Sequence, residues 1–351
     1  MSLQLIIAKI QAWLVRLLLK LPDSWKLKMA GGAPVVLGGR TLDPNMQFIA
    51  HGASRQPPMS SMTPEQAQAT SKQSLAMFAA KPEPGVTWDD LTIPGDGGHE
   101  IPVRVYRPAD QDPAAPMMAY WHMGGGVTLD IEACHAFCTM IAREAKCPIV
   151  SVDYRLAPQH KFPAGLEDCF TAYAWTLKNA GTYGAPAGRA TIGGDSMGGN
   201  FTAIIAQEAA ERGLPRPDLQ LLVYPATDLI TAFPSAEIYG ETFPLSTDTM
   251  DWFISHYLPE GRSRDEEELS PGLATRLENL PPAIIATAGF DPLVDDGAAY
   301  AKKLEAAGVE ATYKCYDSLA HGFTAFTDIV PAARTACLEI ADMVRDAYAR
   351  L

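Results

Sequence analysis

The sequence of 351 residues predicts an α/β protein with a mostly parallel sheet of about eight strands, flanked by helices and covered by a helical cap. Short β-favouring runs alternate with helix-forming runs from about residue 117 onward, which is typical of parallel strands joined by helical crossovers. The run Ala190–Gly193 is followed by a glycine-rich turn and then by a helix-forming run. In such sheets the functional site lies at the carboxyl ends of the strands.

The expected strands are short, and the first two form an antiparallel hairpin before the parallel part begins. They cover residues 88–93, 101–107, 117–121, 149–152, 190–193, 219–223, 283–288 and 311–316. The expected core helices cover residues 131–145, 165–180, 200–212, 297–307 and 332–350. Each candidate functional residue can therefore be judged by whether it follows one of these strands.

Two segments outside this alternation are predicted to form the cap. Residues 1–80 hold a stretch rich in Gly, Pro, Ser, Met and Gln, with short helices expected at 45–50 and 64–80. Residues 226–275 carry several aromatic side chains, an expected helix at 247–257 and an acidic run at 265–268. An insertion at the carboxyl edge of the sheet could line a pocket. The α/β core would then comprise residues 81–225 and 276–351.

Apolar residues recur at helical spacing over residues 3–21. Lys9, Arg16 and Lys20 interrupt this segment, no charged region precedes it and no small-residue cleavage site follows. We therefore expect neither a signal peptide nor a helix stably inserted in a membrane. Two roles stay open: a helix packed on its own protein, or a mobile lid or helix lying on a membrane surface.

Composition limits the partners. The formal net charge of −13 argues against nucleic acid and anionic membrane surfaces as main partners. The six cysteines show neither a CxxC pair nor metal-ligand spacing, which favours a reducing compartment. We expect a cytoplasmic protein that needs no metal or other cofactor, and a homodimer stays open as its assembly state.

The stretch ATIGGDSMGGN, residues 190–200, has the form of a nucleophile elbow around Ser196. Gly194 and Gly198 stand two residues before and after the serine, where the turn is so tight that a side chain would collide with the neighbouring strand or helix. The N-terminus of the following helix adds positive potential where an oxyanion would form. Ser196 is therefore the candidate nucleophile.

A serine hydroxyl needs a base to take its proton and a carboxylate to orient that base. Among seven histidines, His321 is best placed, because it follows the last expected strand in the loop SLAHGF. Asp291 stands just beyond the strand at 283–288, in GFDPLVDD. Singly, Asp291 could be a helix cap and His321 an ordinary loop histidine. Their joint placement, in the order Ser196, Asp291, His321, is that of an α/β-hydrolase triad.

Backbone donors for a developing oxyanion require a chain that approaches substrate without side chains in the way. His122, Met123 and the glycines Gly124–Gly126 follow the third expected strand, where such a loop belongs. A plain flexible loop is the alternative.

With these motifs the chain resembles the hormone-sensitive-lipase-like family of α/β-hydrolases, microbial esterases with an HGGG motif and a GDSAG elbow. The resemblance also rests on DYRLAPQHKFPAGLEDC at 153–169, GFDPLVDDGAAYAKKLEAAG at 289–308, HGF at 321–323 and, more weakly, GGRTLDPNMQ at 38–47. It implies Ser196 as nucleophile, His321 as base and Asp291 as orienting acid. It further implies an oxyanion hole whose backbone donors belong to Gly124, Gly125 and Met197. The scaffold of the oxyanion loop is expected at His122, Met123 and Gly126.

The loop departs from the family pattern, because it reads HMGGG followed by Val127 in place of HGGG followed by an aromatic residue. If the two loops are aligned on His122, the donors are Gly124 and Gly125, and Gly126 stands in place of the aromatic residue. If they are aligned on the glycines, the donors are Gly125 and Gly126. We prefer the first, which keeps the spacing from His122 to Asp130. The missing aromatic predicts a roomier pocket for bulkier esters, partly offset by Met197 in place of the usual alanine. Further pocket residues are expected at Asp195, Phe243, Trp252 and Phe323.

The sequence thus predicts a cofactor-independent serine carboxylesterase that takes small-molecule esters of short to medium acyl chains through an acyl-enzyme. An amidase, an arylformamidase or a lipase would use the same residues on a different bond or chain length. A non-catalytic receptor of the same fold is disfavoured, because all three triad residues are present.

Overall fold

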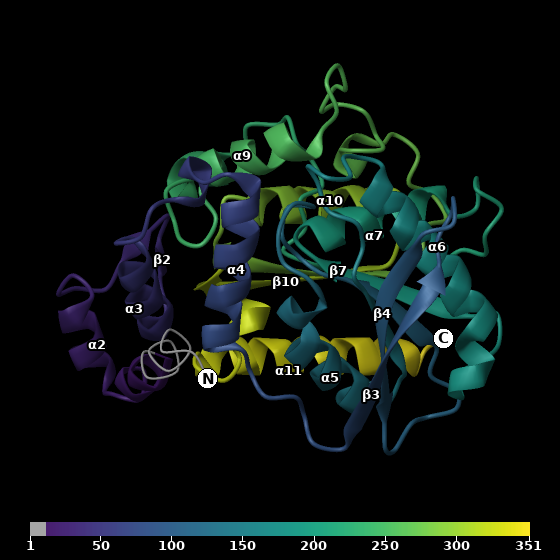
Figure 1. The fold of residues 1–351 in the computed structure, drawn as a ribbon, viewed down its shortest axis with the longest axis horizontal. Coiled ribbons are helices and arrows are strands. Elements are labelled where there is room, and N and C mark those ends of the chain that lie inside the picture. Colours follow the sequence, from purple (N-terminus) through teal and green to yellow (C-terminus); the bar gives the residue numbers. More distant parts are fainter. Residues whose placement is uncertain (1–11) are drawn as a thin grey trace.

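An eight-stranded sheet forms the centre of the computed structural model, which describes residues 12–351 (Figure 1). Its order is β10-β9-β8-β7-β5-β6-β4-β3. The strands are β3 Val86–Pro94, β4 Glu100–Pro108, β5 Met117–Trp121, β6 Ile149–Val152, β7 Ala190–Asp195, β8 Gln220–Val223, β9 Ala283–Phe290 and β10 Ala311–Ala320. Strand β4 pairs antiparallel with β3 and β6, and the remaining pairs are parallel. The predicted α/β class and mostly parallel sheet are confirmed.

Helices cover both faces of the sheet, and this explains the near-continuous apolar runs of the central strands. Every residue of β5, β6, β7 and β8 is buried, as expected of parallel strands packed on two sides. The core helices are α5 His135–Glu144, α6 Ala164–Asn179, α7 Met197–Glu208, α10 Val294–Ala306 and α11 Pro331–Tyr348. Helix α7 begins directly after Ser196, three residues earlier than predicted.

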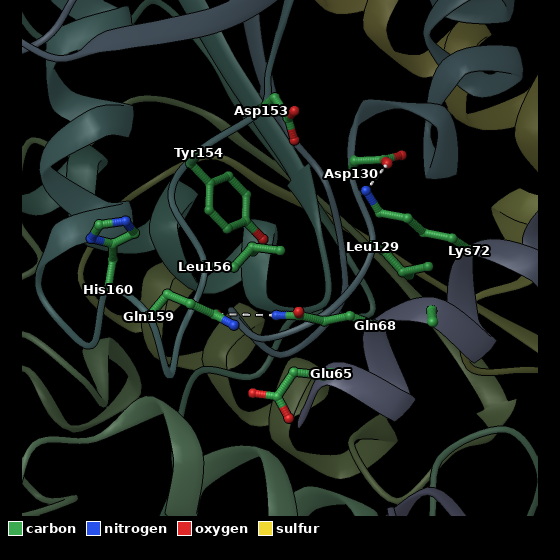
Figure 2. Close-up of a pocket in the computed structure, with 11 residues that line it drawn as sticks. Glu65, Gln68, Lys72, Leu129, Asp130, Asp153, Tyr154, Leu156, Gln159 and His160 are labelled. Atoms are coloured by element: carbon green, nitrogen blue, oxygen red, sulfur yellow. Dashed lines mark hydrogen bonds and ion pairs between the residues drawn. The ribbon is translucent and has the colours of Figure 1, made fainter. Parts of the chain in front are cut away.

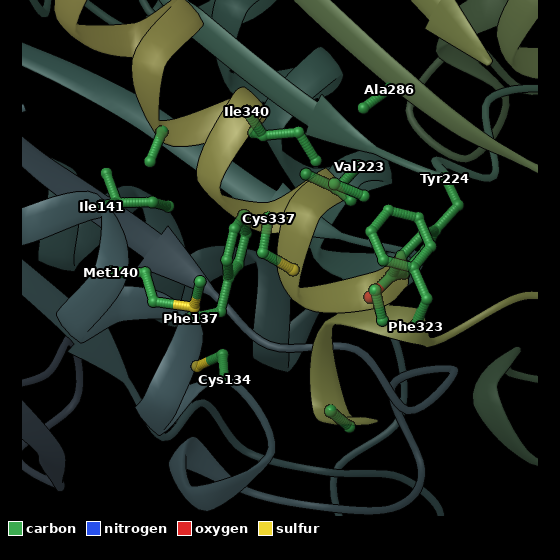
Figure 3. Close-up of a cluster of buried hydrophobic side chains, with 14 of the residues drawn as sticks. Cys134, Phe137, Met140, Ile141, Val223, Tyr224, Ala286, Phe323, Cys337 and Ile340 are labelled. Atoms are coloured by element: carbon green, nitrogen blue, oxygen red, sulfur yellow. The ribbon is translucent and has the colours of Figure 1, made fainter. Parts of the chain in front are cut away.

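Helices α5 and α11 pack together on one face, and α6, α7 and α10 lie on the other (Figure 1). Figure 3 shows the first face, where Phe137 and Ile141 of α5 meet Cys337 and Ile340 of α11. Tyr224, at the end of β8, joins the same cluster and lies close to Phe323. The core on this face therefore extends up to the carboxyl ends of the strands, where the candidate site lies.

The two segments predicted to form the cap contact each other. The first contains α2 Asp23–Met29, β1 Val36–Leu37, β2 Arg40–Thr41, α3 Pro44–Ala53, the 3₁₀ turn η1 Met59–Ser61 and α4 Pro64–Phe78. The second contains α8 Pro234–Tyr239, α9 Thr247–Tyr257 and the turn η4 Pro271–Leu273. The Trp252 indole donates to the Met62 carbonyl at 3.1 Å, and Arg40 donates to the Tyr239 hydroxyl at 2.8 Å. The predicted boundaries at residues 80, 225 and 275 stay predictions.

The first cap segment is also fastened to the core. Asp43 caps α3 by accepting from the backbone N–H groups of Asn45 and Met46, with proline at the first helical position. Asn45 in turn donates to the Ile329 carbonyl at 2.8 Å, and the Asp43 N–H donates to the Ser318 carbonyl at 2.9 Å. The N-terminal end of α3 is thereby held against the last residues of β10 and the loop before α11.

Of the helix predicted at residues 3–21, residues 12–18 are helical and the part up to residue 11 lies outside the described residues. Across residues 12–351, no helix is both long and apolar enough to cross a membrane.

Candidate active site

Ser196 lies in the sharp turn between β7 and α7. Its backbone has φ 56° and ψ −115°, a conformation that is strained for a residue with a side chain and that recurs at nucleophile elbows. The Ser196 N–H donates to the Val223 carbonyl at 2.9 Å, which ties the turn to the end of the adjacent strand β8. The serine side chain keeps partial exposure, while both neighbours in the chain are buried.

The glycines that flank the serine are required by the close approach of backbone. A Cβ on Gly194 would lie 2.3 Å from the Gly198 carbonyl oxygen, and a Cβ on Gly198 would lie 2.0 Å from the Trp121 carbonyl oxygen. Both obstacles are main-chain atoms, which cannot rotate aside as a flexible side chain can. The predicted collision with the neighbouring helix and strand is confirmed for both positions.

The structure brings Ser196, His321 and Asp291 together although they are far apart in the sequence. The Ser196 Oγ lies 2.9 Å from His321 Nε2, and His321 Nδ1 lies 2.7 Å from Asp291 Oδ2. Asp291 is fully buried, and its second oxygen accepts from the Leu293 N–H at 2.9 Å. A carboxylate acceptor keeps the proton on His321 Nδ1 and leaves Nε2 free to accept the serine proton.

Asp195 lies behind this chain of hydrogen bonds and not in a pocket wall. Its carboxylate is fully buried and accepts from the Tyr224 hydroxyl at 2.9 Å and from the Thr324 hydroxyl at 3.1 Å. Burial raises the pKa of Asp195 to about 6. The Tyr224 ring packs against the His321 ring at a centroid distance of 4.7 Å. Asp195 therefore supports the loop that carries His321, which corrects its prediction as a residue that lines the pocket.

The glycine loop after β5 begins close to the serine turn, because a Cβ on Gly198 would lie 3.1 Å from the His122 carbonyl oxygen. Gly124–Gly126 all have positive φ, and the Gly124 carbonyl accepts from the N–H groups of Val127 and Thr128 at 3.0 and 2.9 Å. Within residues 12–351, the N–H groups of Gly124–Gly126 and of Met197 donate to no protein acceptor. Donors of this kind can hold an oxyanion. Both loop alignments considered from the sequence include Gly125.

His122 is a buried, neutral part of this loop. Its ring stacks on Tyr154 at 4.2 Å and 10°, and its Nδ1–H donates to the Met123 carbonyl at 2.6 Å. The Tyr154 hydroxyl donates to the His122 carbonyl at 2.8 Å. Burial lowers the pKa of His122 to about 4, so the imidazole is uncharged at neutral pH. These contacts hold the loop, in line with the scaffold role implied by the resemblance.

Aromatic rings from α9 cover the glycine loop. A Cβ on Gly125 would lie 2.3 Å from the Phe253 ring, and one on Gly126 would lie 2.7 Å from the Tyr257 ring. The expectation of a roomier pocket at Gly126 is therefore wrong, because the Tyr257 ring fills the space of the missing aromatic side chain. The sequence did not single out these two rings. Phe253 and Tyr257 are one helical turn apart on an expected cap helix, and this spacing could have predicted that both rings face the same way.

Two other expected pocket residues are also buried in packing. Phe323 has no accessible surface and packs edge-on against Tyr224 and Tyr316 at centroid distances of 5.2 and 5.5 Å. Trp252 is buried between the cap segments. Phe323 is therefore part of the core, which corrects its prediction as a pocket residue, whereas the place of Trp252 in the pocket stays a prediction. Phe243 is half-buried, and its place in the pocket stays a prediction.

A separate cavity of about 580 Å³ lies between α4 and the loops around residues 129–130 and 153–160 (Figure 2). None of the triad residues lines it. Figure 2 shows Lys72 paired with Asp130, and Asp153 nearby. The Lys72 Nζ lies 2.9 Å from an Asp130 carboxylate oxygen. Burial and the neighbouring carboxylate of Asp130 raise the pKa of Asp153 to about 6. The cavity adjoins the glycine loop through Tyr154, whose ring stacks on His122. Over residues 12–351, no three or more His, Cys, Asp or Glu side chains are grouped to hold a metal ion.

The chain is similar to known proteins in both sequence and structure. Residues 118–325 match the family model described as the α/β hydrolase fold. The carboxylic ester hydrolase LipN of Mycobacterium tuberculosis is 38% identical over 318 residues, which cover 88% of this chain and 84% of the relative. The ethyl acetate hydrolase of Pseudomonas putida is 34% identical over 293 residues, which cover 82% of this chain and 92% of that enzyme.

The solved structures to which this chain is similar are also ester hydrolases. The ester hydrolase EH1AB1 from the metagenome of Lake Arreo, in complex with a derivative of bipyridine phosphonate, superposes with a TM-score of 0.83 at 34% identity. That superposition covers 88% of this chain and 99% of EH1AB1. A thermostable esterase from Pseudomonas putida ECU1011 has a TM-score of 0.81 at 28% identity, covering 87% of this chain and 97% of the esterase.

Proposed function

The chain belongs to the hormone-sensitive-lipase-like carboxylic ester hydrolases of the α/β-hydrolase family, and within this family we propose that it hydrolyses small-molecule esters of short to medium acyl chains with Ser196 as nucleophile. The observation that carries this proposal is the hydrogen-bonded chain from Ser196 Oγ through His321 to the buried Asp291, with distances of 2.9 and 2.7 Å. The Met197 N–H next to this serine donates to no acceptor among residues 12–351.

In the proposed mechanism, Ser196 Oγ attacks the ester carbonyl carbon while His321 Nε2 takes the serine proton. Asp291 stabilises the imidazolium that forms, and the loop donors together with the Met197 N–H hold the oxyanion. His321 returns the proton to the leaving alcohol, and an acyl-enzyme remains. Water then attacks the acyl carbon, His321 takes its proton, and the acid leaves as the proton returns to Ser196. No metal or cofactor takes part in these steps.

The acyl range is supported by the crowding over the glycine loop. The rings of Phe253 and Tyr257 lie against Gly125 and Gly126, and the Met123 side chain lies near Gly322, beside His321. Bulky groups on this side leave limited room next to the reacting carbonyl. We therefore propose that long acyl chains are poor substrates.

The test is the initial rate of hydrolysis of p-nitrophenyl esters from acetate to palmitate, with Ser196→Ala as the matched control. We expect a maximum at short to medium chains and a loss of about 10⁴- to 10⁶-fold in the variant. Equal, slow rates for both proteins at every chain length would refute ester hydrolysis by Ser196. A maximum at palmitate would instead identify a lipase, and faster cleavage of a matched amide would identify an amidase.

We also propose a cytoplasmic location, supported by cysteines that are all free thiols. A homodimer stays a prediction.

A further inference from the structure

The surface formed by residues 13–37 is unusually apolar. Thirteen large hydrophobic side chains are exposed among residues 12–351, and eight of them fall in this short stretch. We call these eight the N-terminal patch: Trp13, Leu14, Leu17, Trp25, Met29, Val35, Val36 and Leu37. Single exposed apolar residues are normal, but a cluster that includes two tryptophans at 62% and 63% exposure indicates an interaction surface.

The patch is the outward side of elements whose inward side is already packed. In the helix at residues 12–18, Val15 packs on the core and Arg16 donates to the Ala79 carbonyl at 2.8 Å, while Trp13, Leu14 and Leu17 face outward. In α2, Lys26 is buried and contacts Asn45 of α3, whereas Trp25 is exposed. Figure 1 shows α2 at the end of the molecule, beyond α3 and α4. The exposed rings therefore contribute little to packing within the fold.

The charge around the patch is opposite to that of the whole protein. Residues 12–37 contain four basic side chains (Arg16, Lys20, Lys26 and Lys28) and one acidic side chain (Asp23), a net charge of +3, whereas the chain carries −13. Lys26 pairs with Asp23 at 2.8 Å, and Arg16 lies 3.9 Å from Asp328. Lys20 and Lys28 are exposed and form no ion pair with any residue from 12 to 351. Exposed tryptophan together with lysine is typical of segments that lie in the headgroup region of a bilayer.

We propose that the N-terminal patch adsorbs the protein onto anionic lipid surfaces, which departs from the expectation drawn from the net charge of the whole chain. A second copy of this chain is a poorer occupant, because a two-fold contact would bring the same positive charges together. The negative charge of the remaining surface would keep other faces away from an anionic bilayer and so orient the protein. Adsorption needs no membrane-spanning helix, and it does not depend on ester hydrolysis.

The experiment is sedimentation of the full-length protein with vesicles of phosphatidylcholine alone or with about one-third phosphatidylglycerol. We expect binding to the anionic vesicles, weakened by salt. Lys20→Glu/Lys28→Glu should reduce binding about twentyfold or more, from about fivefold per lysine. Trp13→Ser/Trp25→Ser should reduce it about tenfold.

Matched controls lie elsewhere on the fold. Lys178→Glu/Lys302→Glu changes two exposed lysines of α6 and α10, and Trp88→Ser changes a tryptophan of β3 that is 37% exposed. Both controls should bind like the wild type, and all variants should keep their thermal unfolding midpoint and their rate on p-nitrophenyl acetate. No binding by the wild type, or equal loss in patch and control variants, would overturn the proposal. A dimer in solution that dissociates in Trp13→Ser/Trp25→Ser, without vesicle binding, would assign the patch to a second copy instead.

Discussion

Replacing Gly198 with alanine is expected to reduce kcat/KM on a p-nitrophenyl ester by about a hundredfold. The new Cβ would be placed 2.0 Å from the Trp121 carbonyl oxygen, at the end of β5. Contacts of a Cβ with a main-chain oxygen essentially never fall below 3.0 Å. The first turn of α7 must therefore move away from β5 by about 1 Å.

This displacement acts directly on the candidate site. Gly198 lies two residues after Ser196, and Met197 between them supplies one of the proposed oxyanion donors. A misplacement of about 1 Å between reacting groups is sufficient for a loss of about 10²-fold. The distance between Ser196 Oγ and His321 Nε2, 2.9 Å in the structure, is expected to lengthen.

The assay compares kcat/KM with the fraction of sites that react with an organophosphonate, so that loss of folded enzyme is separated from slow chemistry. Gly52→Ala in α3 is the control, because a Cβ there meets no atom within 4 Å. We expect the control to keep wild-type activity. If Gly198→Ala kept more than about one-third of the wild-type kcat/KM, the steric argument for the elbow would be refuted.

Two further changes test the buried carboxylates. Asp291→Asn removes the acceptor that fixes the His321 tautomer. In steady-state kinetics at pH 8, kcat should fall by about 10³- to 10⁴-fold with little change in KM. A variant with wild-type activity would show that Asp291 is not part of the triad. Asp296 is buried in α10, where its carboxylate accepts from the Thr227 N–H at 2.7 Å. Burial raises the pKa of Asp296 from 3.8 to about 7. The contribution of Asp296 to the free energy of unfolding is therefore fully present below pH 3.8 and is lost as pH rises through about 7. Between about pH 5.5 and 8 the wild type should lose about 2 kcal/mol from this group, measured by urea unfolding. Asp296→Asn should lack that loss, and parallel curves for the two proteins would contradict the assignment.

The geometry of the elbow could be predicted from the sequence because it depends on local sterics and on a topological rule. Gly194 and Gly198 report a close backbone approach wherever they flank a serine between a strand and a helix. Asp291 and His321 follow strands β9 and β10, and parallel strands bring their carboxyl ends to one edge. The position of each residue after a strand was therefore enough to predict that they lie close together. Their distances come from the structure.

The covering of the site could not be predicted in the same way. Phe253 and Tyr257 reach Gly125 and Gly126 only because the cap folds back over a loop that is more than a hundred residues earlier in the chain. The direction of Asp195 was also missed, although it precedes Ser196. Successive residues of a strand point to opposite faces, and Asp195, the last residue of β7, points to the side of Tyr224.

The wide separation of the proposed triad in the sequence has a consequence for how the protein is made. Ser196 and His321 are 125 positions apart, and they meet only when β7, β8, β9 and β10 lie side by side. A growing chain that has already formed the turn at Ser196 still lacks the loop that carries His321. Non-local pairing of this kind is slow relative to the closing of local turns. Hydrolytic activity should therefore appear last during synthesis and refolding, and a partly made chain in the cell should cleave no ester.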